Sequence, residues 1–259
     1  MQASFSFTRL GLLIRKQWAD HSKLYLLAVV AIFGLMAIAF YLWSLSENHD
    51  PASTYVILIV AMFLGGSIFA SMMFADLSQR TTGIYFLSVP ATHAEKLVCS
   101  ILYSQVLFNL VILISFFILQ PITLSLVKLN PHMHFHSDMA RSEFSMLAKH
   151  ITLGYLSLQA FFLLGSVYFQ RFAFIKTVVG GLLIGVVFVL FIAYLIKPIF
   201  PSHVEMHGIF ELRTDEGQDS SFSYSLPAWQ TYLMRYAVQY IWVPVFWAAT
   251  YFRLKEKEL

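Results

Sequence analysis

Residues 24–44 read LYLLAVVAIFGLMAIAFYLWS and contain no charged side chain. A helix needs about 20 mostly apolar residues to cross the hydrocarbon core of a bilayer. This run is therefore long enough to span a membrane by itself. The residues before it, 1–23, mix polar and apolar side chains. They lack the succession of basic, apolar and small residues that marks a cleavable signal peptide.

The composition of the whole chain indicates the same class of protein. The 259 residues are 58% hydrophobic and 12% charged, whereas a soluble domain has about 25% charged residues. The mean hydropathy is +0.69. The net charge of +3 is too small to indicate nucleic-acid binding. The single cysteine, Cys99, cannot form a disulfide within the chain, and we interpret it as a small buried hydrophobe.

Further segments have the length and character of membrane spans, so we predict an all-α integral membrane protein with six transmembrane helices. The last span is the least regular, because it contains Arg235 and Pro244. Proline is tolerated in a membrane helix where a neighbour satisfies the freed carbonyl. Pro121, just beyond the third span, is expected to end or kink that helix. The predicted spans are 24–44, 53–75, 97–120, 150–170, 177–196 and 230–252.

The segment before the first span, residues 5–20, reads FSFTRLGLLIRKQWAD. Phe7, Leu10, Ile14 and Trp18 recur at helical spacing, and most of the charged residues lie off that stripe. A basic amphipathic helix with a Trp on its apolar side is typical of the membrane interface. We favour such an interfacial helix over the alternative, a basic flank that only sets the topology.

The distribution of basic residues predicts the orientation of the chain. An even number of spans places both termini on one side, and Lys and Arg are enriched on the cytoplasmic side of membrane proteins. With cytoplasmic termini, the inner segments hold most of the 17 basic residues and the outer segments most of the 14 acids. We therefore expect a multi-pass protein of the cytoplasmic (inner) membrane with both termini in the cytoplasm. The inner basic residues are Arg9, Arg15, Lys16, Lys23, Arg80, Lys96, Arg171, Lys176, Arg253, Lys255 and Lys257.

Two outer segments are long. Residues 197–226 are too polar to bury, which predicts an extracytoplasmic loop that forms a small exposed cap or stays mobile. In the other outer segment, His132, His134 and His136 would share one side of an extended strand, a geometry that suits a metal ion. No cysteine or carboxylate cluster supports a metal there, so we favour a polar loop with a local histidine bias.

The connection between spans two and three, residues 76–96, reads DLSQRTTGIYFLSVPATHAEK and is expected to face the cytoplasm. Its apolar cluster before Pro90 needs a membrane surface or a partner protein to cover it. Pro90 disfavours helix in the residue that precedes it. Thr92 and Glu95 have the spacing of a capping box, so the third helix is predicted to begin at Thr92. A tight capped turn and a docking element are both consistent with this pattern.

The stretch GIYFLSVPATHAEKLV, residues 83–98, resembles the LPAS/T…EK signature of ABC-2-type permeases common in Bacteroidota. The opening FSFTRLGLLIRKQW, residues 5–18, is similar to the entry segment of that family. The family's layout also fits: an interfacial elbow helix, six spans, cytoplasmic termini and a coupling loop between spans two and three. This chain has Val89 where the family usually has Leu, a conservative change. Its outer loops have no counterpart in the family, so no substrate is implied.

The resemblance implies a function and a set of partners. Such permeases form dimers that export a substrate or extract it from the bilayer, and a separate ATP-binding subunit supplies the energy. The implied partners are an ATP-binding cassette ATPase, a second permease subunit (in a homodimer or a heterodimer) and membrane lipid, without nucleic acid. ATP and magnesium would belong to the ATPase, and this chain would hold no cofactor. The coupling loop that contacts the ATPase would contain Tyr85, Phe86, Leu87, Pro90, Thr92 and Glu95.

The sequence lacks several motifs, and their absence narrows the possible functional classes. No G-x-x-x-x-G-K-[ST] motif occurs, so we do not expect an enzyme that binds ATP by that route. The near absence of charge in the predicted spans counts against an ion-coupled carrier. Two other classes stay open: a non-transporting membrane scaffold or assembly subunit, and a membrane-embedded enzyme that acts on lipids. Gly65 and Gly66, and likewise Gly181 and Gly185, are interpreted as helix-packing positions.

Overall fold

The computed structural model describes residues 5–45, 53–78, 80–128, 141–169, 171–199, 204–206, 211–215, 221–225, 229–230, 236 and 240–257. The chain divides into two compact units. Unit 1 comprises Met1–Phe174 and Val243–Leu259, and unit 2 comprises Ile175–Trp242.

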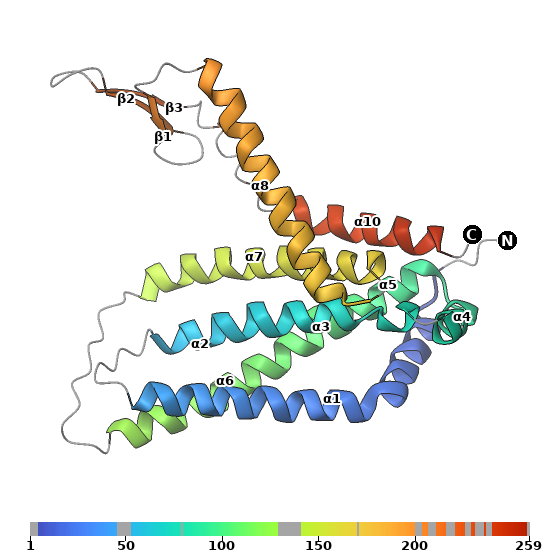
Figure 1. The fold of residues 1–259 in the computed structure, drawn as a ribbon. Coiled ribbons are helices and arrows are strands. Elements are labelled where there is room, and N and C mark those ends of the chain that lie inside the picture. The colour runs from blue at the N-terminus through green and yellow to red at the C-terminus, as the bar shows by residue number, and fades with distance from the viewer. Residues whose placement is uncertain are drawn as a thin grey trace. The chain divides into compact units, whose positions relative to one another are not determined.

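Unit 1 begins with the helix α1 (Phe7–Ser44), which includes both the amphipathic segment and the first predicted span (Figure 1). Its backbone leaves helical geometry at His21, where φ is −119° and ψ is 15°. Figure 1 shows the bend that results, near the end of the helix where α4 lies. The bend gives the basic N-terminal part of α1 a different direction from the charge-free part that follows it.

The next two long helices of unit 1 each contain a π-helical turn. The first consists of α2 (Thr54–Val60), η2 (Ala61–Gly65) and α3 (Gly66–Met72). The second consists of α5 (His93–Ile101), η4 (Leu102–Leu107) and α6 (Phe108–Lys128). Between them lie a short 3-10 helix, η3 (Ala75–Ser78), and the helix α4 (Arg80–Ser88). Because α6 continues through Pro121, that proline does not end the helix.

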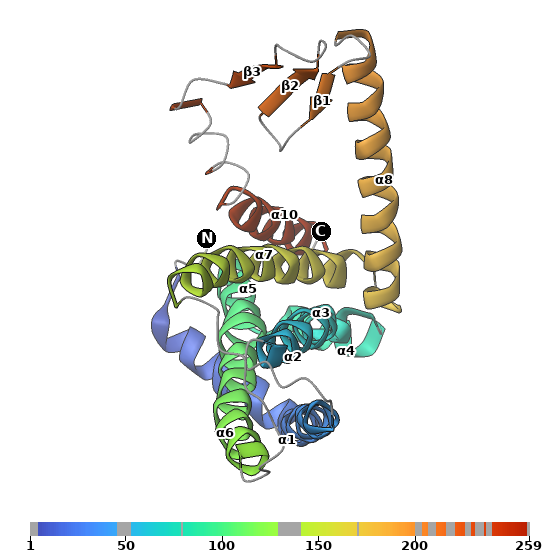
Figure 2. The same cartoon turned by 90° about the vertical axis from the view of Figure 1, so that its left-hand side faces the viewer.

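The helix α7 (Arg141–Tyr168) packs mainly against α3, and α1 packs against α5 and α6 (Figures 1 and 2). The helices α3 and α7 approach each other closely, because a Cβ on Gly66 would lie only 2.6 Å from Nε2 of Gln159. That Nε2 also donates a hydrogen bond to the Ser104 carbonyl oxygen at 3.0 Å, which ties α7 to η4. Gly66 therefore acts in packing within the chain, as the sequence indicated.

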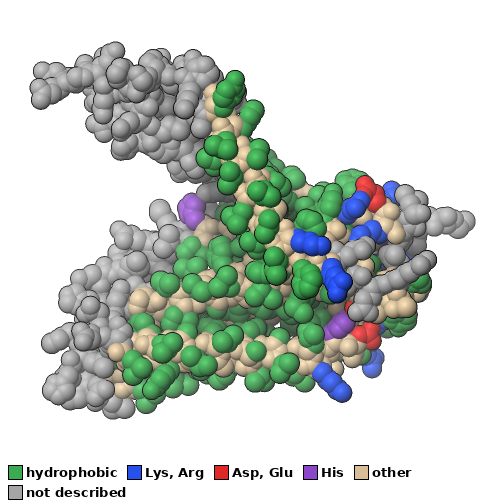
Figure 3. All heavy atoms as spheres, viewed as in Figure 1, with side chains coloured by type: hydrophobic (Ala, Val, Ile, Leu, Met, Phe, Trp, Pro, Cys, Tyr) green, Lys and Arg blue, Asp and Glu red, His purple; other side chains and the backbone are tan. Residues whose placement is uncertain are grey.

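Five helices among the described residues are long and apolar enough to cross a membrane: Phe7–Ser44, Thr54–Met72, His93–Val127, His150–Tyr168 and Ala173–Phe191. Each of them overlaps one of the first five predicted spans. The chain is therefore a multi-pass membrane protein built mainly of helices. Lys, Arg, Asp and Glu side chains of unit 1 gather where α4 and the N-terminal part of α1 lie, and apolar side chains cover the long helices (Figure 3).

The sixth predicted span, residues 230–252, overlaps the helix α10 (Trp242–Glu256), and much of its first half lies outside the described residues. Within unit 1, α10 packs against α7. The rings of Phe246 and Phe161 lie 5.4 Å apart, and the Arg253 guanidinium lies 4.7 Å from the centre of the Tyr168 ring. Leu254 of α10 is fully buried.

Unit 2 contains most of the helix α8 (Ala173–Ile199) and a small antiparallel sheet. The strands are β1 (Val204–Met206), β2 (Glu211–Asp215) and β3 (Ser221–Ser225), paired in that order. The sheet lies in the polar segment 197–226, for which the sequence predicted only an exposed cap or a mobile loop.

Candidate functional site

The connection between α3 and α5 is folded tightly back on itself. Thr82 Oγ1 donates a hydrogen bond to the Asp76 carbonyl oxygen at 2.7 Å, which ties the start of α4 to η3. After α4, the Ala91 N–H donates to the Val89 carbonyl oxygen at 2.7 Å and closes a turn around Pro90. The chain therefore enters α5 directly after leaving α4.

The start of α5 has the capping box that the sequence predicted. The Glu95 N–H donates to Thr92 Oγ1 at 3.3 Å, and the Thr92 N–H donates to Glu95 Oε2 at 2.8 Å. Each side chain thus satisfies a backbone N–H that has no partner within the helix. Thr92 has the extended backbone expected of an N-cap residue, with φ −67° and ψ 155°.

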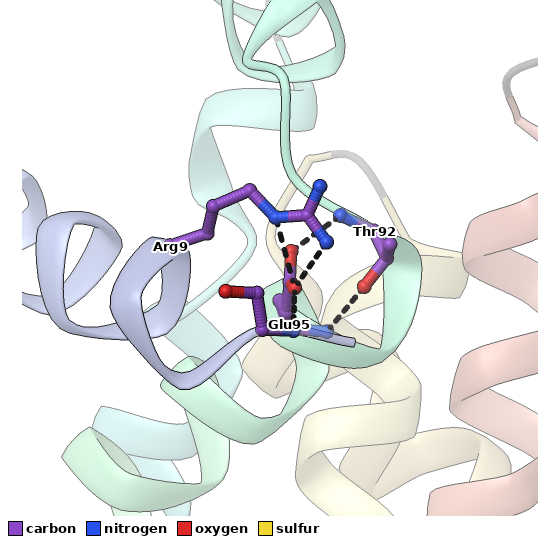
Figure 4. Close-up of polar contacts among 4 residues, drawn as sticks. Arg9, Thr92 and Glu95 are labelled. Carbon is purple, nitrogen blue, oxygen red and sulfur yellow. Dashed lines mark hydrogen bonds and ion pairs between the residues drawn. The ribbon is translucent and has the colours of Figure 1, made fainter. Parts of the chain in front are cut away.

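The second carboxylate oxygen of Glu95 binds the N-terminal part of the chain (Figure 4). Oε1 accepts a hydrogen bond from the Ser6 N–H at 2.7 Å, and the Arg9 guanidinium donates to it at 3.0 Å through Nη2 and at 3.3 Å through Nε. The Glu95 side chain is fully buried, whereas that of Arg9 is 34% exposed. A buried carboxylate is tolerated only when its oxygens are paired in this way. We call Ser6, Arg9, Thr92 and Glu95 the Glu95 joint.

The outer face of the same connection is apolar and uncovered. Ile84 is 62% exposed and Tyr85 is 60% exposed, and Pro90 is also exposed. The Lys16 ammonium, from the N-terminal part of α1, lies 4.4 Å from the centre of the Tyr85 ring, at cation–π distance. We call Ile84, Tyr85 and Pro90 the α4 surface.

Phe86, the next residue of α4, points inward. Its ring meets the ring of Phe74 edge to face at 6.1 Å, and the ammonium of the buried Lys96 lies 5.4 Å from its centre. A small pocket of about 150 Å³ separates this part of α4 from α1. At its edge, Nε2 of His21, the residue at the bend of α1, lies 3.4 Å from Oδ2 of Asp76.

The structure thus divides the residues that the sequence placed in one coupling loop. Thr92 and Glu95 are internal to the Glu95 joint, and Phe86 is partly buried and packs against the core. Tyr85 and Pro90 are exposed. Leu87 lies in α4, but its side chain is outside the part of the structure that is described.

Sequence reasoning missed the partner of Glu95 on α1. The spacing of Thr92 and Glu95 reveals a local capping box, but no local pattern indicates that Arg9 returns to the same carboxylate from 86 residues away. The only available signal was that a basic residue lay in the amphipathic segment. His132, His134 and His136 lie outside the described residues.

Comparison with known proteins adds no relative from which a function could be transferred: no family model, curated protein or solved structure matches the chain.

Proposed function

We propose that this chain is the transmembrane permease subunit of an ATP-driven ABC-2-type exporter, working as a dimer with a separate ATP-binding subunit. In this proposal both termini and α4 lie on the cytoplasmic side of the cytoplasmic membrane. The α4 surface contacts the ATPase, and the chain itself hydrolyses nothing. ATP binding closes the ATPase pair, α4 moves with it, and the helices of the two permease subunits rearrange to release a substrate outward.

The observation that carries the proposal is the α4 surface, an exposed apolar surface on a short helix that is held in place at both ends. Exposed apolar patches at the polar end of a membrane protein favour a protein contact. Such a contact transmits motion only if α4 is held rigidly by the rest of the protein. On one side α4 is tied to η3 through Thr82 and Asp76, and on the other side the turn leads into the fully paired Glu95.

The bend of α1 supports the same interpretation. Before His21, α1 is basic and carries exposed apolar residues, among them Phe7, Leu12 and Trp18. This combination suits the membrane interface, where Trp is enriched. In the proposal this part is the elbow helix. Arg9 links it to the start of α5, so a displacement of α4 reaches the elbow helix and the third span together.

The first test is a pull-down of the full chain from its native host in mild detergent, with mass spectrometry of the proteins that accompany it. We expect a stoichiometric ATP-binding protein. Tyr85→Asp should reduce its recovery at least tenfold, because a charge is placed in the middle of the apolar contact. The matched control is Leu45→Asp, which adds the same charge at a 63% exposed position at the other end of α1.

Each variant must elute as a monodisperse peak with unchanged helix content, so that loss of the ATPase is not loss of fold. Equal recovery with Tyr85→Asp and wild type would reject α4 as the coupling element. Absence of any ATP-binding protein from the wild-type preparation would reject the exporter and favour a scaffold subunit.

The proposed orientation has its own test. Cys99 is 4% exposed, so the native chain should react little with thiol reagents. A Ser220→Cys variant should be labelled by a membrane-impermeant maleimide on intact cells, because residues 197–226 are placed outside. A cysteine introduced at Thr81, in α4, should react only after permeabilisation. The reverse pattern would invert the topology.

A further inference from the structure

A groove of about 520 Å³ lies between the N-terminal part of α1 and the third long helix. This volume is within the range of about 300–1,000 Å³ in which proteins bind small molecules. On the α1 side it is lined by Gly11, Ile14, Arg15 and Trp18. On the other side it is lined by Leu102, Tyr103, Val106, Leu107 and Leu110.

Three features of the sequence build this groove. Gly11 leaves its α1 wall open, because a Cβ at this position would meet nothing within 4 Å. The opposite wall begins with the π-helical turn η4, a distortion that often marks functional sites. The Tyr103 hydroxyl donates a hydrogen bond to the Ile14 carbonyl oxygen at 2.8 Å and joins the two walls. The groove is therefore preformed.

The chemistry of the lining is that of an amphiphile site. Val106, Leu107 and Leu110 are between 37% and 54% exposed and form an apolar wall. From Leu102 to Leu110 this wall follows about 12 Å of helix. Arg15 is the one charged residue of the lining, and no carboxylate pairs with it in the part of the chain that the structure describes. Trp18 beside it is 45% exposed.

We propose that this groove binds one anionic phospholipid from the surrounding bilayer. The phosphate-containing headgroup pairs with Arg15, Trp18 packs at the level of the headgroup, and an acyl chain lies along Val106 and Leu110. The negative charge of the headgroup complements Arg15, and the acyl chain covers the apolar wall. This site is independent of the proposed export function, since it requires only that the helices lie in a membrane.

The test is native mass spectrometry of the full chain in mild detergent, titrated with phosphatidylglycerol or with phosphatidylcholine of identical acyl chains. Wild type should bind phosphatidylglycerol about fivefold more tightly, as expected for one basic residue that faces an anionic headgroup. Arg15→Gln should abolish this preference. It should weaken binding of phosphatidylglycerol more than binding of phosphatidylcholine, because the choline of phosphatidylcholine already neutralises its phosphate. Gly11→Trp should fill the groove and weaken the tightest binding of both lipids about tenfold.

Two matched controls lie on the same helix outside the groove. Gly34→Trp places an indole where a Cβ likewise meets nothing within 4 Å, and Lys23→Gln removes an exposed positive charge. Both should bind the two lipids as wild type does. Equal affinity of wild type for the two lipids would overturn the proposal. So would a loss of preference in Lys23→Gln as large as in Arg15→Gln, or equal effects of the two tryptophan variants.

Discussion

Glu95 and the α4 surface lie within a dozen residues of each other in the sequence, yet their environments are opposite. Glu95 is fully buried, and each of its carboxylate oxygens accepts hydrogen bonds from chain segments that meet there. Ile84 and Tyr85 are more than half exposed, and their apolar side chains lie on the outside of a short helix. The stretch from Ile84 to Glu95 therefore supplies the contact surface and half of the anchor, and the N-terminal segment supplies the other half through Ser6 and Arg9.

This difference shows which substitutions report on structure and which report on binding. When a residue whose polar atoms are all hydrogen-bonded within the chain is replaced, the protein loses stability, whatever partner it binds. An exposed side chain contributes little to folding, so a change there leaves the surface available to test for a partner. Phe86 also reports on structure, in spite of its position next to Tyr85, because its ring packs against Phe74.

The largest effect is expected at the joint. Glu95→Ala should lower the free energy of unfolding by about 3 kcal/mol, because the Ser6 and Thr92 N–H groups and Arg9 lose a shared buried acceptor. Chemical denaturation in mild detergent measures this. The control is Glu256→Ala, which removes the ion pair between the 60% exposed Glu256 and the 37% exposed Arg253 and should change stability by less than about 1 kcal/mol.

A double-mutant cycle tests whether Arg9 and Glu95 stabilise the fold through the same contact. Arg9→Ala combined with Glu95→Ala should destabilise by clearly less than the sum of the two single changes, because both remove the same contact. Additive effects would mean that Arg9 and Glu95 do not stabilise the fold through each other.

The next largest effect distinguishes Phe86 from Tyr85, two adjacent aromatic residues of α4. Phe86→Ala should lower the free energy of unfolding by about 2 kcal/mol, because its ring packs against Phe74 and the interior. Tyr85→Ala should lower it by less than about 1 kcal/mol, since it loses only an exposed cation–π contact with Lys16. Thermal unfolding followed by circular dichroism distinguishes them, and equal losses would contradict the division into inner and outer residues.

A smaller effect than that of Phe86→Ala is expected from the cap itself. Thr92→Ala removes the hydroxyl that accepts from the Glu95 N–H, and should lower the free energy of unfolding by about 1 kcal/mol. Glu95 keeps its bonds to Arg9 and to the backbone of Thr92. Thr92→Ser retains the hydroxyl and should restore most of the stability. A loss as large as that of Glu95→Ala would show that the cap and the joint form one unit.

Local patterns in the sequence predicted a large part of this structure. Charge-free runs of sufficient length located the five helices that the structure identifies as able to cross a membrane. The capping box at Thr92 and Glu95 and the burial of Cys99 are also confirmed. Pro121 was a weaker guide, because the helix continues through it to Lys128. The strands β1, β2 and β3 were not predicted, because residues 197–226 were interpreted as one polar loop. The signal that could have revealed a strand is the sequence SFSYS of Ser221–Ser225, in which Phe222 and Tyr224 alternate with serines.

The sequence by itself determined that this protein crosses a membrane repeatedly, because the length and apolarity of a span are properties of a continuous segment. It also determined where the third helix begins, because a capping box uses residues three apart. Only the tertiary structure decided that Arg9 completes the environment of Glu95, that Phe86 faces inward while Tyr85 faces outward, and that Gly11 opens a groove beside Val106. Each of these depends on segments far apart in the chain, whose side chains meet only after the helices have packed.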